Sequence, residues 1–427
     1  MRGIRSWALA ILFLAATAGS APGMPMFSRK YKVECAYCHT VIPKLTEAGF
    51  QFRAAGWREP TEVGKWDEKE KFNFLVGDYD SLRLQARYDL SRTDNAGVVT
   101  TTNQLTHFEI TLYPLTGAFL GNYSSLFEVS LAAGESPEAE NAYGRGNWKL
   151  GPGHFSARLG IFHPFEGYGA SDRPITIARP LFQTTGGNFN QPTFFTPWAS
   201  PTTGGSFDQA GLELGYTVNR TSFRATVLNG LSFSDEEGTV VPATGLSGSD
   251  SKVRGRPSFN SKDIQLFFTQ ILTDNGGGVS LYYYNGKLDL PVVGSGNAVF
   301  FQNSFNRYAA YASYPVGPVL LLGGYLEGKD DTFTSSAGYG SRNKVRGYFG
   351  EADFLAGNLL GFAARYDNLD PSDLKPADKR TRYTVAVNKA MGNGLQAIAE
   401  YAHTKLEQGT KADRKDDAFQ IRFIWIW

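Results

Sequence analysis

The chain has 427 residues and a formal net charge of +1, with 48 glycines and 14% aromatic residues. A net charge so close to zero gives no support to nucleic-acid binding. No internal run of about 18 apolar residues occurs, which excludes a membrane-spanning helix. Abundant glycine, tyrosine and phenylalanine instead favour many short strands and turns.

The first residues have the pattern of an export signal. Arg2 and Arg5 form a positive start, residues 7–16 are apolar, and Ala16-Thr17-Ala18 offers small residues for cleavage. We therefore expect residues 1–21 to be a signal peptide that is removed on export. An uncleaved anchor helix is the alternative, which the short apolar core disfavours.

The only two cysteines lie in the sequence Cys35-Ala36-Tyr37-Cys38-His39. Haem c is attached through two thiols at this spacing, and the histidine that follows becomes an axial ligand of the iron. The motif predicts one covalent haem c bound by Cys35, Cys38 and His39, with His39 as the metal ligand. Three alternatives stay open at this point: a disulfide, a thioredoxin-like redox pair and a zinc site.

The predicted haem segment, residues 22–64, is short. We expect it to be mostly helical or irregular, with one helix in Thr46–Gly49 that ends at its glycine. So short a segment cannot enclose a haem alone, so the rest of the chain should complete the pocket. The apolar face should come from Pro43, Leu45, Phe50, Phe52 and Trp57. The candidates for the second axial ligand are Met24, Met26, His107, His154, His163, Met391 and His403.

Residues 65–80 contain a mixed charge run and are predicted to be a solvated linker. From residue 81 onward, apolar and polar residues alternate with the period of a β-strand. Leu82, Leu84 and Ala86, for example, alternate with Arg83 and Gln85. Such alternation fits a soluble sandwich with its polar face outside, and equally a membrane barrel with its apolar face outside.

The end of the chain favours the membrane barrel. Phe419, Ile421, Phe423, Trp425 and Trp427 alternate to the last residue, which suits a closing strand with aromatic side chains at the lipid interface. We predict an all-β, antiparallel barrel over residues 81–427. Its roughly sixteen strands begin near residues 81, 104, 121, 141, 154, 208, 221, 262, 278, 303, 318, 343, 358, 381, 394 and 416.

The predicted connections alternate in length. Short turns follow the even-numbered strands, whereas long polar loops at 232–260, 287–300, 329–342 and 367–380 follow odd-numbered ones. This asymmetry is typical of outer-membrane barrels, whose short turns face the periplasm, and it locates the protein in a bacterial outer membrane. The longest connection, 164–208, is expected to narrow the pore, to contact an outside partner, or to have no specific role.

At this point the sequence resembles the fused outer-membrane cytochrome–porins, a family whose best-known members are iron-oxidising monohaem proteins. The whole architecture of signal, haem segment and barrel is similar. Ala48 stands where an aromatic residue is usual and Trp57 where tyrosine is usual. The resemblance rests on Phe27, Arg29, Lys30, Tyr31, Cys35, Cys38, His39, Pro43, Leu45, Gly49, Phe52, Gly56 and Trp57.

The resemblance implies electron transfer across the outer membrane through the haem. The implied partners are membrane lipid, a periplasmic electron carrier such as a soluble cytochrome, and an extracellular donor or acceptor, with Fe(II) as one candidate. The alternative is a diffusion porin in which the haem is structural or sensory. No general acid, nucleophile or substrate pocket is identifiable, so enzymatic activity beyond Fe(II) oxidation is left open.

Overall fold

The computed structural model describes a series of ranges that together cover the plug, the barrel and part of one loop. The expected signal peptide, residues 1–21, and most of the expected linker, residues 66–78, lie outside these ranges. None of the helices described is long and apolar enough to cross a membrane. The ranges are 25–65, 79–132, 137–162, 174–183, 209–229, 231–234, 252–254, 262–291, 300–335, 338–357, 359–374, 377–391, 394–409 and 411–427.

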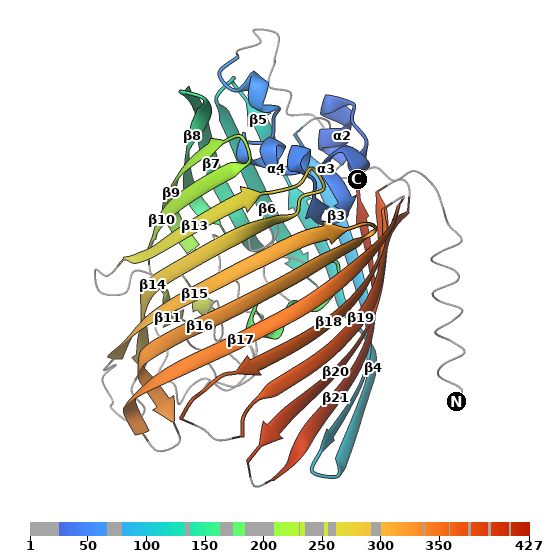
Figure 1. Ribbon diagram of the computed structural model, residues 1–427, viewed down its shortest axis with the longest axis vertical. Helices are drawn as coiled ribbons and strands as arrows, with labels where there is room; N and C mark the ends of the chain where they lie inside the picture. The colour runs from blue at the N-terminus through green and yellow to red at the C-terminus, as the bar shows by residue number, and fades with distance from the viewer. Residues whose placement is uncertain are drawn as a thin grey trace.

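Residues 25–65 form a small unit at one mouth of the barrel, which we call the plug (Figure 1). Its short elements agree with the expected helical or irregular segment. They are α2 (Pro25–Tyr31), α3 (Cys35–Cys38), β1 (His39–Val41), β2 (Lys44–Leu45), α4 (Glu47–Ala54) and the 3-10 helix η1 (Pro60–Glu62).

The prediction that a helix ends at Gly49 is wrong. Helix α4 begins at Glu47 and continues to Ala54, and Thr46 caps its start by accepting a hydrogen bond from the backbone N–H of Gly49. The glycine is needed for packing rather than for termination. A Cβ at Gly49 would lie 2.3 Å from the carbonyl oxygen of Cys38, so only glycine lets α4 lie against α3.

The remaining strands form one closed ring, in which the last strand pairs with the first long one, Trp425 opposite Leu84. Sixteen of the ring's strands are continuous around the wall, because β4 also pairs with β6 and β10 with β13 past the short strands β5, β11 and β12. The strands are β3 (Ser81–Asn95), β4 (Val98–Tyr113), β5 (Gly117–Phe119), β6 (Tyr123–Ala132), β7 (Glu138–Leu150), β8 (Gly153–Phe162), β9 (Gln209–Val218), β10 (Thr221–Leu228), β11 (Leu231–Ser234), β12 (Lys252–Arg254), β13 (Asp263–Ile271), β14 (Gly278–Pro291), β15 (Phe300–Val316), β16 (Val319–Ser335), β17 (Gly338–Gly357), β18 (Leu360–Asp370), β19 (Arg380–Met391), β20 (Leu395–Gln408) and β21 (Lys411–Ile426).

The predicted antiparallel barrel of about sixteen strands is confirmed, strand for strand. Among the predicted short turns, Asn219-Arg220 joins β9 to β10. The expected long loop at 329–342 is wrong, because β16 continues to Ser335 and β17 begins at Gly338. Polar residues predominate there because the strands extend beyond the apolar belt, where neither face needs to be apolar.

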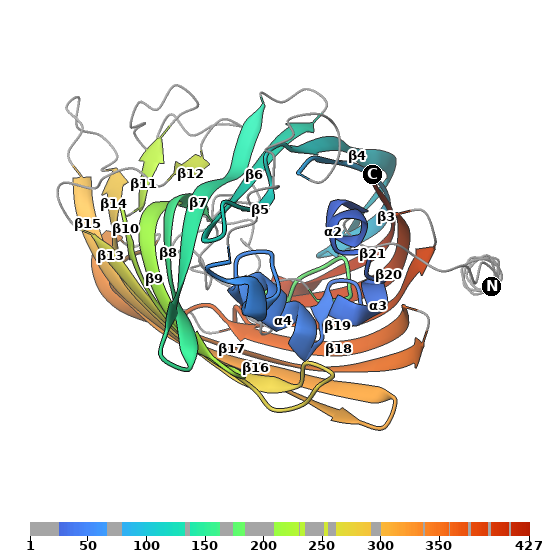
Figure 2. The same cartoon turned by 90° about the horizontal axis from the view of Figure 1, so that it is seen from above.

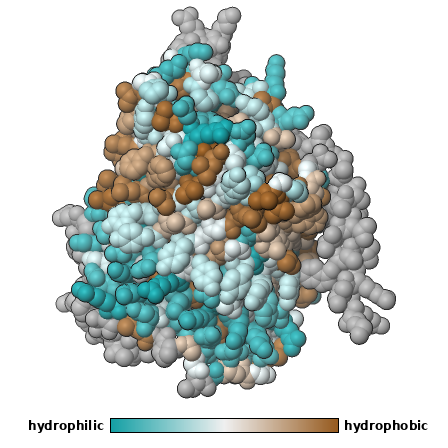
Figure 3. Space-filling model, in the orientation of Figure 1, coloured by the Kyte–Doolittle hydropathy of each residue, from teal (hydrophilic) through white to brown (hydrophobic). Residues whose placement is uncertain are grey.

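Side-chain burial decides between the two interpretations of the alternating pattern. Arg83, Gln85 and Glu109 point inward and are buried, whereas Leu90 and Phe108 are exposed on the outside. The apolar face therefore looks outward, as in a membrane barrel. In Figure 3, hydrophobic residues gather across the upper part of the wall and hydrophilic residues toward the opposite end, in agreement with the predicted outer-membrane location. Because short turns surround the plug, we assign its end to the periplasm.

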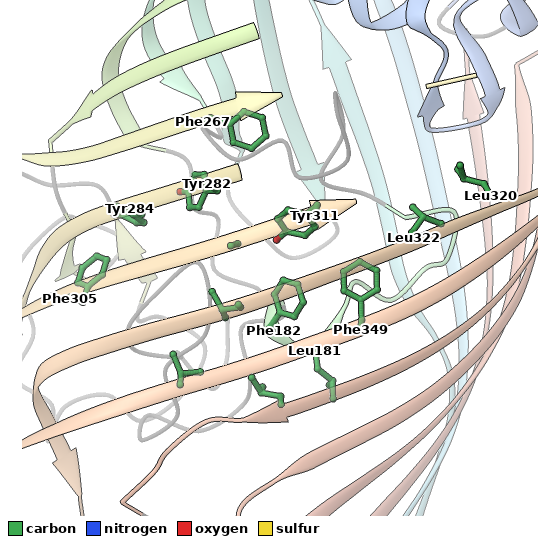
Figure 4. Packing of buried hydrophobic residues seen from close by; sticks show 14 residues of the cluster. Leu181, Phe182, Phe267, Tyr282, Tyr284, Phe305, Tyr311, Leu320, Leu322 and Phe349 are labelled. Atoms are coloured by element: carbon green, nitrogen blue, oxygen red, sulfur yellow. The ribbon is translucent and has the colours of Figure 1, made fainter. Parts of the chain in front are cut away.

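Part of the long connection 164–208 folds into the lumen. In the described stretch, 174–183, the 3-10 helix η2 (Leu181–Gln183) lies among inward aromatic side chains (Figure 4). The ring of Phe182 is 5.6 Å from that of Phe349. The carboxylate of Glu400 accepts hydrogen bonds from the backbone N–H groups of Ile177 and Ala178 at 2.6 and 3.0 Å. The position of the described stretch inside the lumen agrees with one of the roles expected for this connection, narrowing of the pore.

Candidate functional site

The Cys-x-x-Cys-His motif is held by the turn that connects it to α4. Cys35 and Cys38 are the two ends of α3, and His39 begins β1, which pairs with β2. The backbone N–H of Thr46 donates to the carbonyl oxygen of Cys38 at 2.9 Å, and its hydroxyl donates to the carbonyl oxygen of Tyr37 at 2.8 Å. Thr46 therefore caps α4 and fixes the motif at the same time.

A cavity of about 280 Å³ opens beside this motif. Both cysteines, His39 and an aromatic side formed by Phe27, Phe52 and Trp57 line it, with the Phe27 and Trp57 rings stacked at 5.3 Å. The barrel completes the wall, as the short length of the haem segment predicts. Its contributions are Ala390, Gly394, Leu395, Gln396 and Ile426 from β19 to β21 and the turn between β19 and β20.

The potential ligands in the cavity are neutral. Burial lowers the pKa of His39 to about 4, and the smaller effect of the backbone at Lys44 and Pro43 raises it. The imidazole is therefore uncharged at neutral pH. Burial, with a smaller effect of Glu59, raises the pKa of the Cys38 thiol to about 11. Both cysteines are free thiols.

These residues fit a covalent haem c. Two thiols and a neutral imidazole face one mainly apolar cavity, and Nδ1 of His39 is buried without a regular hydrogen bond to any described residue. The cysteines form no disulfide. The described residues contain no group of three or more His, Cys, Asp or Glu side chains placed to hold a metal ion. The elements around the motif form no βαβ unit.

None of the predicted candidates for the second axial ligand lines the described part of this cavity. Met26 is fully buried in α2, and His154 donates from Nε2 to the carbonyl oxygen of Ala54 at 3.0 Å. His403 is 2.8 Å from a carboxylate oxygen of Asp417, and Met391 packs against an apolar cluster. Met24, His163 and the side chain of His107 lie outside the description.

Amide side chains join the plug, the barrel and the inserted loop at one point. Asn388 of β19 donates hydrogen bonds to the carbonyl oxygens of Ile42 in the plug and Ile175 in the loop, both at 2.9 Å. Gln396 of β20 donates to the oxygen of the Asn388 side chain at 2.9 Å and to Ile42 at 3.2 Å. Of the described barrel residues that line the cavity, Gln396 alone is polar, and its amide is hydrogen-bonded.

The opposite side of the plug meets a basic wall. Arg145 of β7 donates to the carbonyl oxygens of Arg53 and Ala54 at 3.0 and 2.5 Å. These are carbonyls at the end of α4, where a helix is electron-rich and favours a cation. At the start of α4, Arg220 forms ion pairs with Glu47 and Asp274. In Figure 2, the helices of the plug lie within the outline of the ring.

Comparison with solved structures agrees with this arrangement at the level of the fold. The barrel is similar to the trimer form of OmpT, an outer membrane protein of Vibrio cholerae, with a TM-score of 0.50, 12% identity, and coverage of 82% of this chain and 99% of that one. It is equally similar to an anion-selective porin from Comamonas acidovorans, with a TM-score of 0.50, 11% identity and the same coverage. No family model and no curated protein matches the sequence.

The protein is therefore a porin-like, closed β-barrel with an N-terminal plug that carries a Cys-x-x-Cys-His motif. Sequence reasoning identifies the three motif residues, and the structure brings them to one cavity. The sequence alone does not identify the barrel residues that line the cavity, such as Ala390 and Gln396. A polar residue at an inward position of a strand, such as Asn388 or Gln396, is the only sequence signal for this part of the site. It does not identify the groups that the side chain contacts.

Proposed function

We propose that the protein transfers single electrons across the outer membrane through a haem c attached to Cys35 and Cys38, with His39 as axial ligand. The observation that carries this proposal is the shared cavity of the two thiols and the neutral imidazole, closed by the barrel wall. When bound, the haem supplies reversible one-electron chemistry at its iron.

The surrounding residues would tune that chemistry. The aromatic side of Phe27, Phe52 and Trp57 and the aliphatic wall residues exclude water, and burial of this kind is one of the factors that set a haem potential. Tyr37, whose side chain lies at the cavity and is 44% exposed, marks where the motif reaches the periplasmic surface. This edge suits contact with a soluble periplasmic electron carrier.

The position of the plug narrows the kind of external donor. The hydrocarbon core of a membrane is about 30 Å thick, and the plug lies at the periplasmic mouth. A particle held outside the cell would be too distant from the motif for direct contact. The proposal therefore requires a small, soluble donor that enters the lumen from outside, and Fe(II) is such a donor.

Proteoliposomes test this proposal. Purified protein is inserted into vesicles that enclose an oxidised soluble cytochrome, and Fe(II) is added outside. We expect reduction of the enclosed cytochrome by the wild type and none by the Cys35→Ser/Cys38→Ser variant. Equal rates with both proteins, after correction for leakage of Fe(II), would contradict the proposal.

A diffusion porin is the second candidate, favoured by the porin-like barrel. The plug and the stretch 174–183 both occupy part of the lumen, which favours low permeability. Planar bilayers distinguish the two functions. Electron transfer predicts conductance well below that of an open sixteen-strand porin, whereas a diffusion porin predicts comparable conductance and uptake of small solutes.

A further inference from the structure

Two acidic side chains of β17, Asp353 and Glu351, are buried on the inner wall of the barrel beside the plug. Asp353 is 0% exposed and Glu351 is 4% exposed. Both carboxylate oxygens of Asp353 and Oε1 of Glu351 are buried without a hydrogen-bond donor among the described residues. A buried carboxylate that keeps its charge needs such donors, because desolvation of the charge is costly. The surroundings of Asp353 therefore do not suit an ionised carboxylate.

Apolar side chains surround Asp353 on both neighbouring strands. In the register of the sheet, Asp353 pairs with Leu320 of β16 and with Ala363 of β18, and both are buried. Ala363 belongs to the same apolar cluster as Val41, which is fully buried in β1 of the plug. The hairpin of β1 and β2 therefore covers this part of the wall and keeps water away from Asp353.

Charged groups face the two carboxyl groups from the plug and from β18. Lys44 of β2 and Arg365 of β18 attract the negative charge of Asp353. Arg365 also donates hydrogen bonds to Oε2 of Glu351 at 3.0 Å and to Asp367 at 2.9 Å. On the other side, β16 places Leu320 and Leu322 opposite the two acids. The firmest contact of a cation in this group is therefore with Glu351 rather than with Asp353.

The carboxyl groups of Asp353 and Glu351 lie within hydrogen-bonding reach of each other. Two ionised carboxylates at that separation repel each other, and neither has a hydrogen to donate. One shared proton removes half of the charge and turns the contact into a hydrogen bond.

We propose that Asp353 and Glu351 bind one proton between them while the plug is docked, and release it when the β1–β2 hairpin leaves the wall and water reaches them. Docking then takes up one proton, so it weakens as the pH rises through the range in which the undocked pair is ionised. The inference is independent of the haem, because neither acid nor Lys44 lines the cavity of the cysteines.

Infrared spectroscopy of the full-length protein in detergent tests the proton directly, because the carbonyl stretch of a protonated carboxyl group is separate from the carboxylate bands. At neutral pH we expect this band in the wild type, with a shift in D₂O. Asp353→Asn should reduce it by the intensity of one group, because Glu351 keeps its contact with Arg365 and ionises. Asp331→Asn, which alters an exposed carboxylate of β16, should leave it unchanged.

Two infrared results would overturn the proposal. One is equal intensity of the band in the wild type and in Asp353→Asn. The other is a wild-type band that appears only after treatment with EDTA, because a metal cation would then occupy the place of the proton.

Hydrogen exchange in residues 39–45 tests the coupling to docking. After correction for the intrinsic effect of pH on exchange, wild-type protection should fall about threefold or more between about pH 6 and about pH 8. Asp353→Asn should show protection that does not change with pH, whereas Asp331→Asn should behave as the wild type. Wild-type protection that is independent of pH, or the same pH dependence in Asp353→Asn, would contradict the proposal.

Discussion

The plug meets the barrel on two sides of opposite chemistry. Toward β19 to β21, the described wall residues that line the cavity of the cysteines and His39 are aliphatic or glycine apart from Gln396. Toward β7 to β10, the wall is rich in arginine and holds the end of α4 by its carbonyl groups. One side thus suits a buried cofactor, and the other supplies the polar contacts that fix the helix supporting the motif.

The largest expected effect follows from crowding on the cavity side. In Gly49→Val, a branched side chain would occupy the space where even a Cβ approaches the Cys38 carbonyl oxygen to 2.3 Å. We expect α4 to separate from α3, with docking of the plug weakened by about 3 kcal/mol. Limited proteolysis of the plug measures this. Gly350→Ala is the control, since nothing lies within 4 Å of its added Cβ, and equal cleavage of both variants would contradict the packing argument.

A smaller effect is expected on the arginine side. Arg145→Ala leaves the carbonyl oxygens of Arg53 and Ala54 without their charged donor, although His154 still bonds Ala54. We expect the free energy of opening of α4 to fall by about 2 kcal/mol. Hydrogen exchange at the C-terminal end of α4 measures the change. If exchange rises equally in α2, the arginine stabilises the whole plug rather than this helix end.

The amide junction should respond more weakly, and in two places together. Asn388→Ala removes the donors to Ile42 and Ile175, while Gln396 keeps its bond to Ile42. We expect docking of the plug to weaken by about 1 kcal/mol and backbone hydrogen exchange in residues 175–178 to become faster. A change confined to the plug would show that the loop does not depend on this junction.

The smallest effect is expected at the ion pairs of Arg220 beside the start of α4. Arg220→Ala removes ion pairs with Glu47 and Asp274, but these groups are solvated and exposed pairs contribute little. We expect exchange at the start of α4 to change slightly at low salt and not at all at high salt. A large, salt-independent effect would mean that the ion pairs of Arg220 hold the plug more strongly than its contacts with β19 to β21 and with β7 to β10.

The barrel could be predicted from the sequence because its two faces have a period of two residues. Leu90 and Phe108 face lipid while Arg83 and Glu109 face the lumen, so alternation and turn signals together indicate every long strand. The prediction failed at 329–342, where the strands leave the apolar belt and the pattern that marks them ends.

The motif could be predicted because its spacing is local and chemically specific. The rest of the site could not, because it depends on contacts across the chain. Ala390 lies more than 300 residues from Cys35 and carries no chemistry of its own. The role of Arg145 depends on the register of β7 against the end of α4, which strand alternation does not determine.

Covalent attachment of haem at the cysteine pair is the central claim, and haem staining after denaturing electrophoresis of the outer-membrane fraction tests it most directly. The wild type and Gly350→Ala are predicted to give a stained band at the mass of the full protein. Cys35→Ser/Cys38→Ser is predicted to give an unstained band while remaining in the membrane. A stained double variant, or an unstained wild type produced with functional haem-attachment machinery, would contradict the account.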